Sequence, residues 1–389
     1  MAIKNNSKLI CVFMSGVFPP PLHGMSAVNA AVRDRLQTAG ARVRVTDTAP
    51  ASLDRGMPAR LGRLPRVLLG LLRLTATRRL RGAALYIGAS GGVGQAYDLS
   101  FLLLARARGM RVFVHHHSFA YLRARRRLAY GLVHAAGRKA IHITQSEAMA
   151  VRLRALYGAA DVSAVSNAVF LVGAAESVRV QPRAALRVLG FLGNIAAEKG
   201  IFEFLDLMAA LRRSGLSLEG RIAGPFQDAA TEVQVRQRLR DLPHVEYAGA
   251  RYGAEKDAFF DSIDTLIFPT RYGNEAEPLV IHEAMQHAVP VIAYGRGCIP
   301  ERVTQACGCV IPPAESFVPA ATAQIEAWVR VPGRFEAASV AAAVRHASLR
   351  TAYARHWQVI EARLLGRESL PGAAQTHDGV ATGPADDLP

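Results

Sequence analysis

The chain has 389 residues, half of them apolar and a fifth charged, which suits two domains better than one ordinary core. This composition excludes a wholly disordered, collagenous or disulfide-built protein. No run of about 18 apolar residues is present, so no membrane-spanning helix is predicted, and the N-terminus has no cleavable signal pattern. Four unevenly placed cysteines predict reduced thiols in a soluble cytoplasmic protein rather than a disulfide framework.

Charge is unevenly distributed along the sequence. Residues 1–170 contain 25 Lys/Arg and 6 Asp/Glu, a net charge of +19, whereas residues 171–389 carry −3 of the total of +16. This split predicts an anionic partner for the first half only. Nucleic acid, an anionic membrane surface and a phosphorylated substrate all meet that description.

The first half of the chain alternates short apolar runs with amphipathic helical patterns. Strands are predicted at residues 9–15, 42–46, 84–87, 111–115, 141–144 and 162–165, and helices at residues 24–38, 64–73, 96–108 and 147–157. This alternation is typical of a doubly wound α/β domain with a parallel sheet.

The same pattern restarts near residue 187. Strands are predicted at residues 187–192, 218–223, 245–247, 265–268 and 289–293, and helices at residues 200–213, 232–239, 256–262, 279–287 and about 335–365. After Arg367 the chain is rich in Gly, Ala, Asp and Pro without periodicity.

We therefore expect two Rossmann-like α/β domains that face a central cleft. The first, basic domain is placed at residues 1–175 and the second, nucleotide-sugar-binding domain at residues 176–345. A C-terminal helix at residues 346–366 is expected to pack back on the first domain, and residues 367–389 to form a disordered tail. Ligands of open parallel sheets bind beyond the carboxyl ends of the strands, so both domains would present their loops to the cleft.

The strongest chemical signal lies in residues 268–293. Glu275 stands in a loop after a strand, and Glu283 lies in the helix that follows. A helix N-terminus is an anion site suited to a diphosphate, and carboxylates beside it accept hydrogen bonds from sugar hydroxyls. Acidic residues near a helix start also favour the helix dipole. That simpler explanation covers Glu275 and Glu277 but not Glu283, which is surrounded by apolar residues.

This segment resembles the donor-binding signature of the GT-B retaining glycosyltransferases of family 4 (glycosyl transferases group 1). Residues 189–200 resemble the phosphate loop of that family, residues 222–225 its next strand and turn, residues 166–169 the turn that closes its first domain, and residues 19–25 its first glycine loop. The resemblance covers roughly residues 8–365. It implies the GT-B fold and transfer of a sugar from a nucleotide diphosphate sugar to an acceptor hydroxyl.

The resemblance also implies roles for single residues. Lys199 would neutralise the donor diphosphate, Glu275 would bind a hydroxyl of the donor sugar, and Glu283 would bind the ribose. The family often has Arg where Asn194 stands, and Arg271 is a candidate substitute. Pro278 has no N–H, so backbone donors must come from its neighbours. The implied donor-binding set is Gly16, Gly24, Asn194, Lys199, Glu275, Ala276, Glu277, Leu279 and Glu283.

Three consecutive histidines, His115, His116 and His117, end a predicted strand. Adjacent strand residues point to opposite faces and cannot bind one metal ion together. The sequence also lacks an Asp-x-Asp motif at a strand end, so we expect neither a metal nor another cofactor. The family resembled often places a polar residue, frequently His, beside the donor sugar. His117 is the first candidate for this catalytic position, with Lys199 and Glu275, and His116 is the second.

Basic residues cluster in two places in the first half. The helix at residues 64–73 carries leucines on one face and Arg66 and Arg73 on another, and a second cluster contains Arg123, Arg125, Arg126 and Arg127. Such a helix can lie at an anionic membrane interface, or it can pack its apolar face on the sheet and leave its arginines in water. The second arrangement is favoured for the helix itself. The summed charge favours an anionic acceptor and peripheral attachment at the inner face of the cytoplasmic membrane.

The sequence is compatible with three functions. The first is a hexosyltransferase-type glycosyltransferase in cell-surface polysaccharide, lipopolysaccharide or glycolipid biosynthesis, and the alternative is a GT-B-fold sugar-nucleotide epimerase. The third, a nucleic-acid binder suggested by an isoelectric point near 10.3, is disfavoured because few aromatic residues accompany the arginines. The sequence does not specify the sugar, the base, the acceptor, the linkage or the oligomeric state.

Overall fold

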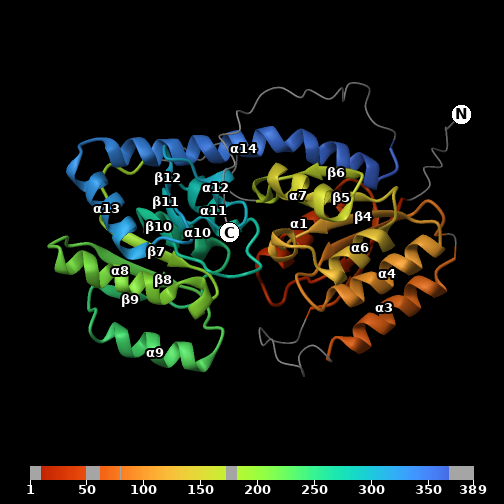
Figure 1. The fold of residues 1–389 in the computed structure, drawn as a ribbon, viewed down its shortest axis with the longest axis horizontal. Helices are drawn as coiled ribbons and strands as arrows, with labels where there is room; N and C mark the ends of the chain where they lie inside the picture. The colour runs from red at the N-terminus through yellow and green to blue at the C-terminus, as the bar shows by residue number, and fades with distance from the viewer. Residues whose placement is uncertain (1–9, 50–61, 79, 172–181, 368–389) are drawn as a thin grey trace, which may run out of the picture.

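The computed structural model describes residues 10–49, 62–78, 80–171 and 182–367. These residues form two α/β domains that lie side by side, with one long helix running along both (Figure 1). The tail predicted after Arg367 lies outside the described residues. The predicted fold class, two doubly wound domains with parallel sheets, is confirmed.

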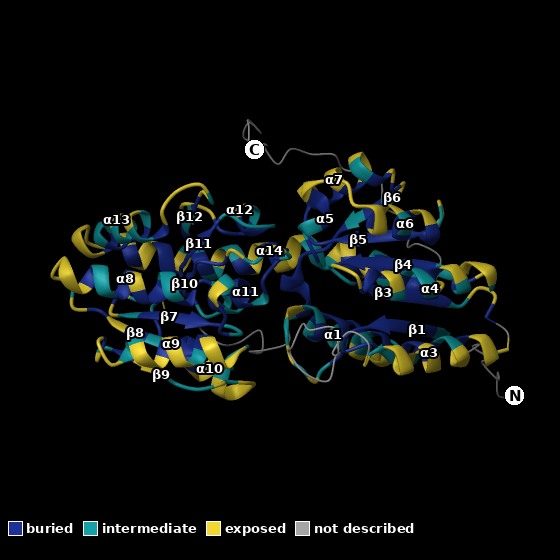
Figure 2. Cartoon of the chain, turned by 60° about the horizontal axis from the view of Figure 1, so that its bottom comes forward, coloured by how far each residue is buried: buried dark blue, intermediate teal, exposed yellow. Residues whose placement is uncertain are grey.

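The first domain contains a six-stranded parallel sheet with the order β2-β1-β3-β4-β5-β6. Its strands are β1 (Cys11–Gly16), β2 (Arg42–Asp47), β3 (Ala84–Ala89), β4 (Arg111–His116), β5 (Ile141–Thr144) and β6 (Asp161–Ala164). Its helices are α1 (Gly24–Thr38), α3 (Leu64–Ala76), α4 (Gln95–Ala107), α5 (Ala120–Arg123), α6 (Arg127–Ala136), α7 (Glu147–Tyr157) and the 3-10 helix η1 (Asn167–Phe170). Every residue of β3 is buried because helices cover both faces of the sheet, as the burial colours show (Figure 2).

The second domain repeats this plan with the strand order β12-β11-β10-β7-β8-β9. Its strands are β7 (Val188–Leu192), β8 (Glu219–Ala223), β9 (Val245–Tyr247), β10 (Thr265–Phe268), β11 (Val291–Tyr294) and β12 (Gly308–Ile311). Its helices are η2 (Ala197–Lys199), α8 (Ile201–Arg213), α9 (Ala229–Leu239), α10 (Ala254–Asp261), α11 (Leu279–Gln286), α12 (Ile299–Arg302) and α13 (Phe317–Arg330). Strand β12 and helix α13 were not predicted.

Helix α14 (Arg334–Leu364) has 31 residues and connects the two domains. Its first turns pack on the second domain, where Phe335 meets Trp328 with 5.6 Å between ring centroids. Its last turns pack on the first domain, where Trp357 lies 4.8 Å from Phe170 and Arg363 forms a 2.6 Å ion pair with Asp161. The helix therefore begins earlier than the domain boundary expected at residue 345. None of the described helices is long and apolar enough to cross a membrane.

Candidate functional site

A cavity of about 400 Å³ lies between the two domains. Loops that follow β1, β3 and β4 form its wall on the first domain, and loops that follow β7 and β10 form its wall on the second. The residues that line it include Val17, His23, Gly24, Arg63, Ser90, Gly91, His117, Gln145, Asn167, Asn194, Lys199, Tyr272, Asn274, Glu275, Ala276, Glu277 and Pro278. The carboxyl ends of both sheets thus open on one shared space, which is where doubly wound folds bind ligands.

Lys199 and Glu275 form an ion pair on the wall of this cavity. The Lys199 Nζ lies 2.6 Å from Oε2 of Glu275, and the same oxygen accepts a 3.0 Å hydrogen bond from the Thr270 hydroxyl. The lysine also lies over the Tyr272 ring, 4.4 Å from its centroid. A lysine on the wall of an open cavity can move to a bound anion, because its long side chain is flexible and its one ion pair among the described residues is with Glu275.

A glycine after Lys199 brings this pair together. Gly200 has a φ of 88°, in the left-handed region, and a Cβ there would lie only 2.3 Å from the carbonyl oxygen of Pro269. Only glycine permits this close approach of the start of α8 to the loop that carries Glu275. The loop is held further by the N–H of Arg271, which donates to the carbonyl of Glu198.

The remaining predicted donor-site residues divide into two groups. Gly24, Asn194, Ala276 and Glu277 line the cavity, whereas Gly16, Leu279 and Glu283 do not. Gly16 gives room to the side chain of Asn29, whose Nδ2 would lie 2.9 Å from a Cβ at residue 16. Leu279 packs against the core of the first domain.

Glu283 has a partner of its own away from the cavity. Its Oε1 lies 2.6 Å from the Nζ of Lys256 on α10, and both side chains are mostly buried. A ligand that recruits Glu283 would have to reach past the lined cavity and compete with this lysine.

Arg271, the suggested substitute cation, points elsewhere, because it pairs with Glu203 at 3.1 Å and donates to the Tyr294 hydroxyl.

The three histidines separate as strand alternation requires. The ring centroids of His115, in β4, and His117, directly after β4, lie 4.1 Å apart, and His116 contacts Tyr121 and His142 on the opposite face. His117 is the one of the three that lines the cavity. Burial, with a smaller contribution from His23, lowers the pKa of His117 to about 3, so its ring is uncharged at neutral pH. Burial also lowers the pKa values of His115 and His116.

The six basic residues assigned to the acceptor or a membrane lie outside the cavity. All six are exposed, on α3, on α5, on the segment that joins α5 to α6 and at the start of α6: Arg66, Arg73, Arg123, Arg125, Arg126 and Arg127. Arg66 donates to the carbonyl of Ala49, and Arg125 lies over the Tyr130 ring.

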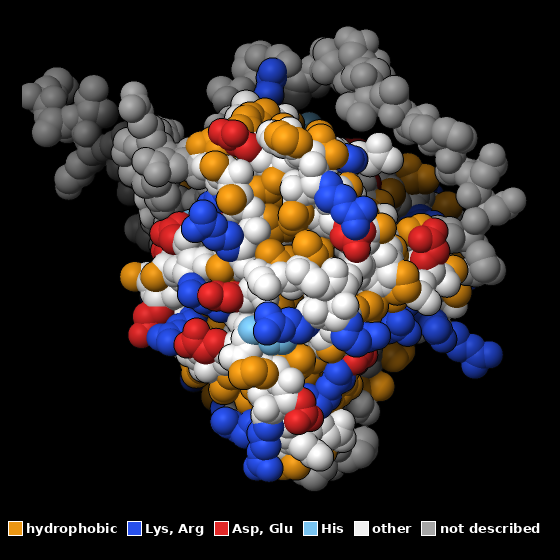
Figure 3. All heavy atoms as spheres, turned by 90° about the vertical axis from the view of Figure 1, so that its left-hand side faces the viewer, with side chains coloured by type: hydrophobic (Ala, Val, Ile, Leu, Met, Phe, Trp, Pro, Cys, Tyr) orange, Lys and Arg blue, Asp and Glu red, His pale blue; other side chains and the backbone are white. Residues whose placement is uncertain are grey.

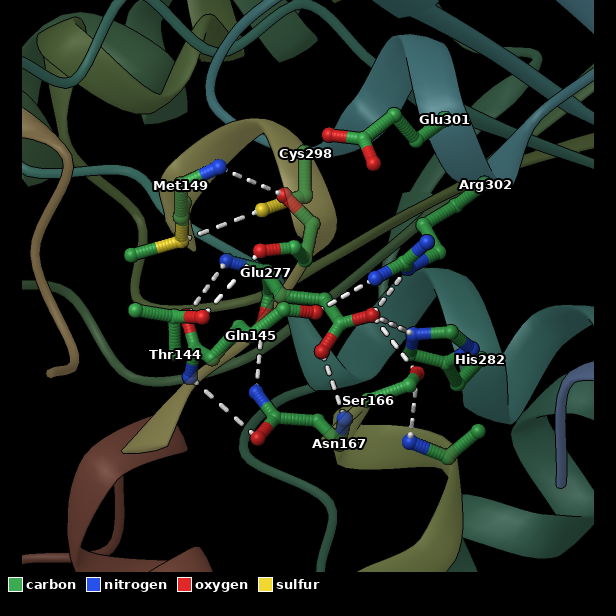
Figure 4. Close-up of polar contacts among 12 residues, drawn as sticks. Thr144, Gln145, Met149, Ser166, Asn167, Glu277, His282, Cys298, Glu301 and Arg302 are labelled. Atoms are coloured by element: carbon green, nitrogen blue, oxygen red, sulfur yellow. Dashed lines mark hydrogen bonds and ion pairs between the residues drawn. The ribbon is translucent and has the colours of Figure 1, made fainter. Parts of the chain in front are cut away.

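A buried polar cluster between the domains was missed by sequence reasoning (Figure 4). Its centre is the Glu277 carboxylate, whose side chain is fully buried. Oε1 accepts a 2.7 Å hydrogen bond from the Ser166 hydroxyl and also contacts the Nε of Arg302 and, at 3.0 Å, His282 Nε2. Oε2 accepts the backbone N–H of Asn167. Ser166 and Asn167 belong to the first domain, so this single carboxylate connects both.

The electrostatics keep Glu277 ionised. Burial alone would raise the pKa of this carboxyl, but Arg302, His282 and the N–H of Asn167 together outweigh it and lower the pKa to about 2. Arg302 gains in turn from the carboxylate, which raises the pKa of its guanidinium despite burial. The backbone N–H of Glu277, one of the predicted diphosphate donors, donates instead to Gln145 Oε1 at 3.2 Å. The turn at Ser166 and Asn167 was the only sequence signal for this cluster.

Comparisons with known proteins bear on the sequence of the second domain and on the fold of the whole chain. Residues 186–330, less than half of the chain, match the family model described as glycosyl transferases group 1. No curated protein matches the sequence. The match lies within the second domain, from β7 to α13.

Solved structures match almost the whole chain. Sucrose-phosphate synthase from Thermosynechococcus elongatus superimposes with a TM-score of 0.69 at 15% identity, covering 92% of this chain and 99% of that one. HepE of Anabaena in complex with UDP gives 0.63 at 16% identity over 90% and 100% of the two chains. The lipopolysaccharide outer core galactosyltransferase WaaB gives 0.57 at 16% identity over 88% and 99%. The chain therefore has the GT-B fold of these glycosyltransferases.

Proposed function

We propose that this protein is a glycosyltransferase that transfers a sugar from a nucleotide diphosphate sugar to an acceptor hydroxyl. The observation that carries the proposal is the Lys199–Glu275 pair, which stands in a cavity between two sheets whose carboxyl ends face each other. The group 1 match supports it because residues 186–330 contain both members of the pair. Among the similar structures, HepE was solved with UDP, with UDP and glucose, and with UDP-glucose.

The roles of the pair follow from their charges. Lys199 would leave Glu275 for the diphosphate and stabilise the negative charge that develops there as the sugar departs. Glu275, still hydrogen-bonded to Thr270, would then accept a hydrogen bond from a hydroxyl of the donor sugar. We propose that the acceptor attacks from the face that the diphosphate leaves, with retention of configuration and without a covalent intermediate. His117 would border the reacting centre from the first domain.

Nucleotide binding provides the direct test. Titration calorimetry with UDP, GDP and ADP should identify one nucleotide that binds, and Lys199→Met should weaken it at least about tenfold, since a charge-assisted contact is worth about 1.5–3 kcal/mol. Lys139→Met, which removes an exposed lysine outside the cavity, should bind as the wild type does. If no nucleotide binds, or if both variants bind equally well, the proposal is wrong.

The reaction itself separates transfer from the alternative, epimerisation. Incubation of the sugar nucleotide that binds, without acceptor, would yield its epimer if the protein were an epimerase. Under our proposal the released nucleotide appears only when an acceptor glycan or water takes the sugar. We also propose that transfer needs no metal ion, because Lys199 and backbone amides supply the positive charge, so EDTA should leave the rate unchanged.

The surface of the first domain indicates where an acceptor could be presented. Helix α3 buries Val67, Gly70 and Leu74, while four leucines on its outer side are 42–65% exposed. These are Leu64, Leu68, Leu69 and Leu72. The favoured expectation that the leucine face of this helix packs on the sheet is therefore wrong for these four. The end of the second domain, by contrast, intersperses basic and acidic side chains (Figure 3).

We propose that this leucine row and the six exposed arginines named above bring the enzyme to an anionic bilayer at the inner face of the cytoplasmic membrane. An amphipathic helix with basic flanks binds such surfaces through apolar burial and electrostatic attraction. The acceptor would then be a lipid-linked glycan of cell-surface polysaccharide, lipopolysaccharide or glycolipid synthesis. The lipopolysaccharide galactosyltransferase among the similar structures supports this choice of pathway.

Vesicle sedimentation tests the membrane proposal. The protein should sediment with anionic vesicles and not with neutral ones, and salt should weaken binding because charges are screened over about 8 Å at physiological ionic strength. Replacing Arg123, Arg125, Arg126 and Arg127 with Gln should reduce sedimentation without weakening nucleotide binding. Equal binding to both vesicle types, or a loss of nucleotide affinity in that variant, would contradict the assignment.

A further inference from the structure

We propose that Glu277, Asn167 and Gln145 act as positioning residues that hold the proton of His117 on Nε2, so that His117 donates a hydrogen bond to a ligand in the cavity. The ligand atom would be a hydroxyl or phosphate oxygen. The inference deepens the proposed function, because it concerns the same cavity, but its test does not require transferase activity.

The starting points are two backbone groups of Glu277, whose donor and acceptor roles are fixed. The N–H of Glu277 donates to Gln145 at 3.2 Å, so the Gln145 atom that faces it is Oε1. The carbonyl of Glu277 accepts a 2.8 Å hydrogen bond from Asn167, so that atom is Nδ2. The backbone of one residue thereby fixes the orientation of both side-chain amides.

The orientations then fix the proton of the histidine. With Oε1 turned to Glu277, the amide nitrogen of Gln145 lies 3.2 Å from Asn167 Oδ1 and 3.2 Å from His117 Nδ1. An amide nitrogen only donates, so Nδ1 must accept and carries no proton. A neutral imidazole with an unprotonated Nδ1 has its proton on Nε2.

The surroundings of His117 keep it in this neutral form. Its ring packs against the ring of His115, and His23 is the titratable group that adds repulsion against a second proton. Burial lowers the pKa of His117 to about 3. Its Nε2 is buried and has no hydrogen-bond partner among the described residues. A donor without a partner in a cavity wall is satisfied when a ligand oxygen arrives.

The same contacts limit the chemistry of His117. The lone pair of Nδ1 is occupied by Gln145, and Nε2 carries the proton, so the ring has no free basic site. His117 therefore orients or polarises an oxygen and does not remove a proton from the acceptor.

The geometry also couples His117 to the arrangement of the domains. Gln145, Asn167 and His117 belong to the first domain, whereas Glu277 belongs to the second and is held there by Arg302. The guanidinium of Arg302 also donates to the carbonyl of Gln145, which anchors the backbone of that residue. Separation of the domains would free both amides and remove the preference for Nε2.

The test replaces the donor of Gln145 with an acceptor. Gln145→Glu keeps an oxygen for the N–H of Glu277 but offers His117 a carboxylate oxygen in place of an N–H, so a proton must move to Nδ1. We would record ¹⁵N–¹H correlation spectra of histidine in the full-length protein without nucleotide, and assign His117 by the signal lost in His117→Gln. The wild type should show the Nε2–H form and Gln145→Glu an Nδ1-protonated form.

Two further variants keep the test decisive. Gln234→Glu adds the same charge at an exposed position of α9 and should leave the His117 signal as in the wild type. Gln145→Leu removes the donor without adding charge and should give a mixture of the Nδ1–H and Nε2–H forms. This variant serves as the test if Gln145→Glu does not fold. An Nδ1–H form in the wild type, or an unchanged signal in both Gln145 variants, would overturn the proposal. If the wild type bound no nucleotide, the proposed function would be wrong, but the measured position of the proton on His117 would still stand.

Discussion

Glu275 and Glu277 stand two residues apart on one loop and both border the cavity, yet their side chains have different surroundings. Glu275 faces the cavity and pairs with the partly accessible Lys199 at 2.6 Å. Glu277 is fully buried and is held by Arg302, His282, Ser166 and Asn167. The first carboxylate can exchange partners with a ligand, whereas the second is bound on every side.

The comparison teaches that the surroundings of a carboxylate, rather than its place in a sequence signature, decide its role. Both glutamates were expected to serve the donor, one through its side chain and the other through its N–H. The N–H of Glu277 instead orients Gln145. Three predictions test this division between a ligand-binding and a structural glutamate.

The largest effect is expected from Glu277→Gln. This variant leaves the buried Arg302 without a counter-charge, and breaking one partner of a buried pair costs about 3–5 kcal/mol. Chemical denaturation should show this loss, with a reduced midpoint and an unchanged slope. Adding Arg302→Gln to the variant should restore part of the lost stability, because no unpaired charge then remains; a double variant as unstable as the sum of both single changes would contradict the ion-pair argument.

Acid should produce a somewhat smaller effect through the same group. The pKa of Glu277 is about 2 in the folded protein against an ordinary 4.5, so unfolding takes up a proton at acid pH. Its contribution, about 3 kcal/mol, is complete above the ordinary pKa and is lost as the pH falls towards the folded value. Denaturation measured between about pH 5 and pH 2 should therefore show the gap between the wild type and Glu277→Gln narrowing. A constant gap would mean that the charge of Glu277 does not stabilise the fold.

The smallest effect on stability is expected from Glu275→Gln. The side chains of this pair are mostly buried but border the cavity, so Lys199 can be solvated when its partner is neutral, and the loss should be smaller than for Glu277→Gln. The melting temperature should change by only a few degrees, whereas sugar transfer should fall sharply because the hydroxyl acceptor is weakened. A destabilisation as large as that of Glu277→Gln would show that both glutamates are structural.

Much of the fold could be predicted from the sequence, because hydrophobic periodicity is strong in buried parallel strands. Helix α7 illustrates this: Ser146 caps its start by accepting from the N–H of Met149, and Gly158 ends it in the left-handed conformation. Strand β12 was missed because it begins with Gly308 and continues with the half-buried Cys309 and Val310, so its apolar pattern is weak.

The candidate site was predictable only in part. Lys199 and Glu275 stand in segments with a readable signature, and the structure brings them into contact. Gln145 and Arg302 have no local signal, since their roles depend on residues 132 and 25 positions away along the chain. Contacts across a domain interface arise from tertiary packing, which periodicity does not encode.

Helix α14 has a consequence for the order in which the chain folds during synthesis. Trp357, Ile360 and Leu364 are buried in a hydrophobic cluster of the first domain together with Val12, Met14 and Tyr86 of β1 and β3. Domains generally fold as units, N-terminal first, as they leave the ribosome. Here the N-terminal domain cannot complete its core until nearly the last described residues have been translated, so its unfilled apolar groove stays open while the second domain is made. A fragment that ends before α14 would carry that groove permanently.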